Sequence, residues 1–280
     1  MPSLPLGGLS CRTLNREVMV PKFEGNANFV QFGDHVENSF LPSQTAIGQV
    51  PNGVRIYAIG DIHGRLDLLD QVLSRVDIHL VDNPIIQPIH VFLGDYIDRG
   101  PDSRTVLDRL IERSRSHAMV FLKGNHEAFL LDFLREPLVL DQWRKFGGLE
   151  TLISYGLRPS VKITAGQHEE LAVELERILP PGHLKFYLEL KTYFECGEYF
   201  FVHAGVRPGV ALARQQEGDL LWIRGEFLQY EKSFGKIIVH GHTPVSQPEI
   251  RSNRINIDTG AYATGMLTCL MLEADRLDFV

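Results

Sequence analysis

Five short segments of the sequence place acidic, imidazole or amide side chains beside glycine at the end of an apolar run. They are IGDIHG (59–64), LGDYIDRG (93–100), KGNHE (123–127), FFVHAG (200–205) and IIVHGHTP (237–244). An apolar run that stops abruptly in this way is typical of a buried strand that delivers its last residues into a cleft. Carboxylate, imidazole and amide groups without thiolate suit reactive Mn²⁺, Fe or Zn²⁺ better than a structural zinc.

The spacing predicts a site for two metal ions. Asp61 and His63 are two residues apart, so in extended chain their side chains point to one side and can bind one ion. Asp95 could bridge this ion to a second one. A pair of ions about 3.5–4 Å apart is the arrangement that clamps an in-line displacement at phosphorus. The expected ligands of the second ion are Asn125, His203 and His242.

Each of these residues also has a simpler interpretation. Asp61 or Asp102 could cap a helix, and a single buried histidine is more often a core residue than a ligand. Five such segments in order, each at the end of a predicted strand, favour the functional interpretation. His240 is a candidate to face the same cleft, with a core or surface role as the alternative. We expect ordinary roles for His35, His79, His90, His117, His168 and His183.

The elements that must position these segments alternate between strand and helix. Such alternation with short loops predicts right-handed βαβ units and a parallel sheet, and ligands bind beyond the carboxyl ends of such strands. The five segments should therefore converge. The predicted strands are 54–59, 89–93 and 118–122, and the predicted helices are 65–76, 102–115 and 127–134.

The remaining regions differ in character. Residues 1–51 have several prolines and no sustained period, which predicts an irregular arm. Its Phe29, Phe32 and Phe40 could dock on the body, with a mobile tail as the favoured alternative. Residues 52–280 are predicted to form one domain, with a mostly helical insertion at about 137–190. The segments that follow the insertion indicate a second, β-rich layer; they are 191–205, 236–241, 254–260 and 267–273.

Composition limits the class of protein. A chain of 280 residues can bury one sizeable core, and its 28 Lys+Arg against 35 Asp+Glu give a net charge of −7, which argues against nucleic acid as a partner. The three cysteines are far apart, which favours a reducing compartment. No segment resembles a signal peptide or a membrane span, so we expect a cytoplasmic protein without a membrane partner. The oligomeric state is left open.

The motifs GDIHG, GDYIDRG, GNHE, HAG and GHTP, in this order, resemble those of the phosphoprotein phosphatase family within the calcineurin-like metallophosphoesterases. The similarity is greatest to bacterial serine/threonine phosphatases and covers about residues 54–273. HAG stands where eukaryotic members have HGG, and their tyrosine-bearing C-terminal loop is missing. The resemblance implies a mixed α/β fold, a four-layer α/β/β/α sandwich, with two divalent ions, expected to be Mn with Fe or Zn as alternatives.

The resemblance also implies roles for individual residues. Asp61, His63 and Asp95 would bind one metal, and Asp95, Asn125, His203 and His242 the other. Arg99 and Arg224 would hold the phosphate oxygens, and His126 would be the general acid, oriented by Asp98. A metal-activated hydroxide would attack phosphorus in line.

Three functions fit this set of residues. The first is a phosphomonoesterase acting on phosphoserine or phosphothreonine in proteins, or on a small phosphoester. The second is a symmetrical hydrolase of diadenosine tetraphosphate, for which Trp143 in the insertion could stack a base, with packing of the insertion as the alternative role. The third is a non-catalytic binding module on the same fold, against which the complete set of ligands argues.

Overall fold

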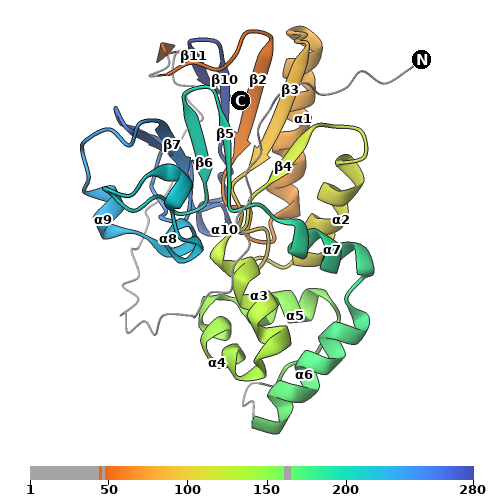
Figure 1. The fold of residues 1–280 in the computed structure, drawn as a ribbon. Coiled ribbons are helices and arrows are strands. Elements are labelled where there is room, and N and C mark those ends of the chain that lie inside the picture. Colours follow the sequence, from red (N-terminus) through yellow and green to blue (C-terminus); the bar gives the residue numbers. More distant parts are fainter. Residues whose placement is uncertain (1–43, 46–47, 161–164) are drawn as a thin grey trace.

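The computed structural model describes residues 44–45, 48–160 and 165–280. Most of the predicted arm, including Phe29, Phe32 and Phe40, lies outside these residues. Two sheets and the helices that cover them make up the described part (Figure 1).

The first sheet has six strands in the order β1-β11-β10-β2-β3-β4. Its centre follows from the apolar runs, because every residue of the segment VRIYAI is buried and β2, β3 and β4 pair in parallel. The six strands are β1 (Gln44–Thr45), β2 (Val54–Ile59), β3 (Gln87–Phe92), β4 (Met119–Phe121), β10 (Cys269–Glu273) and β11 (Arg276–Phe279).

The second sheet has five strands in the order β5-β6-β7-β9-β8. Strands β5 and β6 form the predicted antiparallel hairpin, whereas β6, β7 and β9 run in parallel. The five strands are β5 (Tyr193–Cys196), β6 (Tyr199–Val202), β7 (Ile237–His240), β8 (Glu249–Ile250) and β9 (Arg254–Asn256).

The sheets pack face to face, with helices on their outer faces (Figure 1). Ala58 and Val91 of the first sheet share one apolar cluster with Phe201 and Val239 of the second. The outer face of the first sheet is covered by α1 (Leu66–Asp82) and α2 (Ser103–Arg113), and that of the second by α8 (Glu217–Trp222) and α9 (Gly225–Leu228). The predicted four-layer α/β/β/α sandwich is therefore confirmed.

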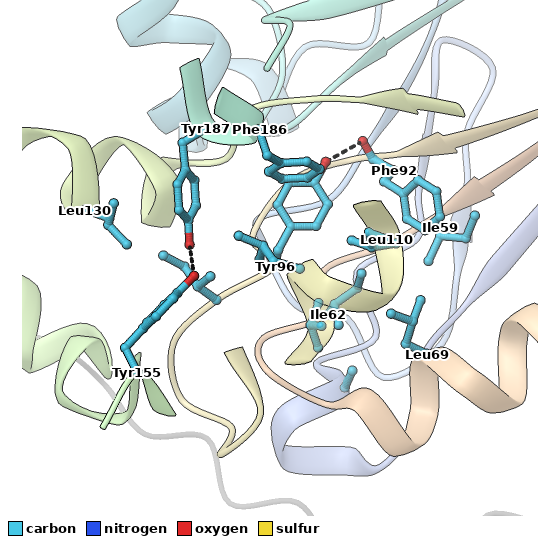
Figure 2. Close-up of a cluster of buried hydrophobic side chains, with 14 of the residues drawn as sticks. Ile59, Ile62, Leu69, Phe92, Tyr96, Leu110, Leu130, Tyr155, Phe186 and Tyr187 are labelled. Atoms are coloured by element: carbon cyan, nitrogen blue, oxygen red, sulfur yellow. Dashed lines mark hydrogen bonds between the residues drawn. The ribbon is translucent and has the colours of Figure 1, made fainter. Parts of the chain in front are cut away.

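Further helices form a lobe at the carboxyl ends of the strands (Figure 1). Its core is continuous with that of the first sheet, because Tyr96 and Phe92 cluster with Tyr155 and Tyr187 of the lobe (Figure 2). The Tyr155 and Tyr187 hydroxyls lie 3.3 Å apart. The helices of the lobe are α3 (Asn125–Arg135), η1 (Pro137–Val139), α4 (Leu140–Trp143), η2 (Arg144–Phe146), α5 (Gly148–Ser154), α6 (Ala165–Ile178) and α7 (Pro181–Glu189).

Two short helices complete the described part, η3 (Leu212–Arg214) and α10 (Ala261–Thr264). No helix among the described residues is long and apolar enough to cross a membrane.

The C-terminal strands correct one expectation. Residues 267–273 were assigned to the second layer, but β10 pairs with β2 in the first sheet, with Cys269 opposite Ile59. Both sheets need apolar strands of the same kind, so the sequence of β10 does not distinguish them. Helix α3 also begins at Asn125, two residues before the predicted start, so Asn125 and His126 lie in its first turn.

Candidate active site

The ends of five strands converge, as their sequences predict. Asp61 follows β2, Asp95 follows β3, and Asn125 opens the helix after β4. His203 and His242 follow β6 and β7 of the other sheet. The site therefore lies where the carboxyl ends of both sheets meet, and all of these side chains are buried.

The Asp95 carboxylate lies at the centre of the site. Its Oδ2 is 3.5 Å from His203 Nε2, 3.6 Å from His63 Nε2 and 3.7 Å from His126 Nε2. Two groups of side chains there have ligand atoms close enough to hold an ion. Both groups include Asp95; they are His63, Asp95 and His126, and Asp95, His203 and His242.

Backbone carbonyls orient two of the imidazoles. His63 Nδ1 donates to the carbonyl of Ile97 and His203 Nδ1 to that of Leu93, both at 2.9 Å. Because those nitrogens carry the proton, the Nε2 lone pairs face Asp95. Burial lowers the pKa of both histidines, so both rings are neutral near pH 7, as metal ligands must be.

Asn125 and His242 extend the same cluster. His203 Nε2 is 2.9 Å from Asn125 Oδ1 and 3.2 Å from His242 Nδ1. Arg224 Nε donates to the other nitrogen of His242, Nε2, at 3.0 Å and so holds the ring beside the cluster. The three predicted ligands of the second metal are thus adjacent.

The two carboxylate oxygens of Asp61 show whether a cation fits this site. Its Oδ2 accepts a hydrogen bond from the His242 backbone N–H at 3.0 Å, but its buried Oδ1 has no partner. Burial, together with Asp258 and Asp95, raises the pKa of Asp61 well above its usual range. A buried acceptor without a donor, among further carboxylates, is the environment that a divalent cation stabilises. The residues present therefore fit a metal centre.

Asp98 contacts His126, as the motifs implied, and is itself held by a network that the motifs did not predict. Asp98 Oδ2 accepts from His126 Nδ1 and from Trp143 Nε1, both at 2.6 Å. Asp98 Oδ1 accepts from the Thr151 hydroxyl at 2.5 Å, and the Asp98 N–H donates to Thr151 and Ser103. Trp143 and Thr151 come from the helical lobe. The suggested base-stacking role of Trp143 is wrong, because its ring is fully buried.

Glu127 and Asp258 are two further residues that sequence reasoning missed. Glu127 accepts backbone N–H groups of Asp95, Tyr96 and Gly124, at 2.8–2.9 Å, and so fixes two of the site loops. Burial raises the pKa of Asp258 to about 6, with Asp95 adding to the effect. The last residue of GNHE was a visible signal for Glu127, and the signal for Asp258 was an apolar run that ends in Asp-Thr-Gly.

Two arginines border the cluster. Arg99 Nη2 lies 3.4 Å from His126 Nε2, and its guanidinium stacks over the ring of Tyr262 at 4.3 Å. Arg224 is held beside His242 and is exposed. Both predicted phosphate-binding residues therefore lie next to the predicted metal ligands.

The backbone of the site is strained. Six non-glycine residues among those described have a positive φ, and all but Ala274 are in the site motifs. This left-handed conformation is unfavourable for residues with a side chain. The five in the motifs are His63, Asp95, Asp98, Arg99 and His242.

His240 does not face the cluster. Its ring lies edge-on to Phe227, 4.8 Å away, and burial lowers its pKa to about 3. Because successive side chains alternate across a strand, His240 points into the helix-covered outer layer of the second sheet. Its role is one of packing, as the alternative interpretation expected.

Comparison with known proteins adds three findings. The family model described as calcineurin-like phosphoesterase matches residues 54–278. The chain is 27% identical over 234 residues to the asymmetrical bis(5'-nucleosyl)-tetraphosphatase PrpE of Anoxybacillus flavithermus, covering 76% of this chain and 88% of the relative. It is 28% identical over 232 residues to the protein of the same name from Bacillus subtilis, covering 75% and 87%.

Solved structures show the same fold. A putative diadenosine tetraphosphatase superposes with a TM-score of 0.54 at 18% identity, covering 85% of this chain and 98% of that one. The cold-active protein-tyrosine phosphatase of a Shewanella species gives 0.52 at 18% identity, covering 82% and 80%.

Proposed function

This chain belongs to the calcineurin-like phosphoesterase family, and from that premise we propose that it hydrolyses dinucleoside tetraphosphates, dividing them asymmetrically. The observation that carries the proposal is the central Asp95 carboxylate within 3.7 Å of three imidazoles. The names of the curated relatives favour this substrate over a phosphoprotein, which was the first expectation from sequence. They also favour asymmetrical cleavage over the symmetrical cleavage that the sequence suggests.

The metal centre would be held by residues already adjacent to one another. His63 and Asp95 would bind one ion together with Asp61, whose buried Oδ1 has no partner. Asp95, Asn125, His203 and His242 would bind the other. When bound, two divalent ions supply positive charge for the phosphate and lower the pKa of water toward neutrality. Glu127 would keep the Asp95 loop in place for this purpose.

The arginines would bind the polyphosphate. Arg99 carries a planar guanidinium fixed against Tyr262, and Arg224 presents a second one beside His242. Forked N–H donors of this kind match the non-bridging oxygens of a phosphate group, where charge accumulates in the transition state.

His126 would protonate the leaving oxygen from Nε2. Burial alone would lower the pKa of His126, but the carboxylates of Asp95 and Asp98 raise it above its usual value. The raised pKa favours the protonated ring, and Nδ1 is already committed to Asp98. General acid catalysis of this kind contributes roughly 10²–10⁴ in rate.

Product analysis tests the proposal. Incubation with diadenosine tetraphosphate and Mn²⁺ should release ATP and AMP in equal amounts, and the variant Asp95→Asn should release neither. Two molecules of ADP would show that the cleavage is symmetrical. Release of phosphate from a phosphoserine peptide, with the dinucleotide left intact, would overturn the proposal in favour of a protein phosphatase.

A further inference from the structure

Two exposed aromatic rings lie beside the candidate active site. Among the described residues, ten large apolar side chains are exposed, and eight of them are aliphatic. The two aromatic ones are Phe146, 38% exposed, and Tyr262, 40% exposed. Both contact residues assigned to phosphate chemistry, since Phe146 lies against His126 and Tyr262 against Arg99.

The position of Phe146 is fixed by its surroundings. Its ring is stacked on that of Phe129, with centroids 5.5 Å apart and planes at 23°. The same ring is nearly perpendicular to the ring of His126, with centroids 6.4 Å apart. Gly147 follows in a left-handed conformation, and its carbonyl accepts the backbone N–H of Arg99 at 3.2 Å. Phe129 thus supports one face of the Phe146 ring, and 38% of the residue is exposed to solvent.

Tyr262 has a different arrangement. The Arg99 guanidinium covers one face of its ring, and the ring also contacts His63 edge-on at 5.4 Å. Its ring therefore supports the arginine. Phe146, in contrast, stacks on another aromatic side chain and is partly exposed next to His126.

We propose that Phe146, supported by Phe129, is the subsite that stacks a nucleobase of the substrate. This inference rests on the proposed function, because a nucleotide bound through its phosphate at Arg99 and His126 has a base to place nearby. Stacking of a base on an aromatic side chain is a sequence-tolerant interaction. The exposed Lys145 adds a positive charge in the same turn, which suits a ligand that joins a flat base to an anionic chain.

The test compares two ligands that differ only in the base. We would measure the affinity of the Mn²⁺-loaded protein for AMP and for ribose 5-phosphate by calorimetry. The unchanged protein should bind AMP about 5- to 150-fold more tightly. Phe146→Leu should reduce this ratio to near 1, and Phe146→Trp should keep it. The affinity for inorganic phosphate should be the same in all three proteins.

Leu138→Ala is the matched control, because Leu138 is an exposed apolar residue of the same lobe. It should leave the AMP preference unchanged. A ratio near 1 in the unchanged protein, or a ratio that Phe146→Leu does not alter, would overturn the inference. If the ratio does not change while diadenosine tetraphosphate is still cleaved to ATP and AMP, the subsite is wrong and the function stands. If Phe146→Leu abolishes the preference for AMP but the unchanged protein does not cleave the dinucleotide, the subsite stands and the function is wrong.

Discussion

At the scale of single residues, His126 is the side chain whose proton matters most. Its Nδ1 is bonded to Asp98, and its Nε2 lies 3.7 Å from Asp95 and 3.4 Å from Arg99. When His126 is protonated, its Nε2 and the Arg99 guanidinium are both donors. An anionic oxygen between them would accept from both, which fits a group leaving from phosphorus.

The first prediction concerns this proton. His126→Asn should keep both metals by elemental analysis, because Asp61 and not His126 is the proposed third ligand beside His63 and Asp95, although His126 is also within reach of that ion. Turnover should fall about 10²-fold or more on an alkyl phosphate and much less on p-nitrophenyl phosphate, whose leaving group needs no proton. An unchanged rate on the alkyl phosphate would show that His126 is not the general acid.

The site residues that could be predicted from sequence are those that share a position at the end of an apolar strand. Asp95, His203 and the other motif residues each end an apolar strand, so their shared position was visible without a structure. Trp143 and Thr151 reach Asp98 from sequence positions about fifty residues away, and neither lies in a motif. Their roles depend on how the lobe packs, which no local pattern specifies.

At the scale of elements, the helical lobe contributes side chains to the candidate active site. Helices α4 and α5 supply the Trp143 and Thr151 donors to Asp98, and Gly148 lies so close that a Cβ there would be 2.5 Å from the Trp143 ring. These contacts make the orientation of His126 depend on the lobe. The sequence predicted the helices of this region but not their contact with the site.

The second prediction tests that dependence. Trp143→Phe keeps a large ring but removes one hydrogen bond to the Asp98 carboxylate. We expect kcat on an alkyl phosphate to fall about tenfold, with a smaller effect on p-nitrophenyl phosphate. The control is Phe133→Leu, which alters a ring that packs on Trp143 without removing a donor. Equal losses on both substrates would indicate that Trp143 is only structural.

The third prediction concerns His90 in strand β3. Its ring is fully buried, neither ring nitrogen has a partner, and it stacks on Tyr57 at 5.6 Å. Burial, with Arg113 adding, lowers the pKa of His90 to about 4. The neutral form is thus favoured in the folded protein, so stability is present above pH 6.5 and is lost as the pH falls from 6.5 toward 4.

His90→Phe removes this dependence. We expect the free energy of unfolding of the variant minus that of the unchanged protein to be about 2 kcal/mol larger at pH 5 than at pH 8. The variant is thus relatively more stable at the lower pH. Chemical denaturation in EDTA at the two pH values measures it without a contribution from metals. If the two proteins differ in stability by the same amount at pH 5 and at pH 8, burial does not keep His90 neutral.

At the scale of the whole molecule, the site joins the two sheets. His63 and Asp95 follow strands of the first sheet, and His203 and His242 follow strands of the second. The order of the segments predicted two layers and their convergence. The return of β10 to the first sheet was missed, because strand pairing is a property of the complete fold.

The fourth prediction follows from this bridging position. An ion held by ligands from both sheets binds the folded chain and not the unfolded one, so it stabilises the fold. Mn²⁺ at 100 times its Kd should raise the Tm of EDTA-treated protein by about 5 °C or more. Asp95→Asn should abolish this increase. An equal Tm with and without metal in the unchanged protein would contradict the proposed ligand set.

The five left-handed residues of the motifs have a consequence for protein engineering. Glycine would relax the backbone at Arg99 or His242, since it adopts a positive φ without steric cost. A laboratory selection for heat resistance alone would therefore favour replacements at these positions and enrich chains that no longer turn over substrate. Thermostable variants of this enzyme should be sought with activity imposed at every round.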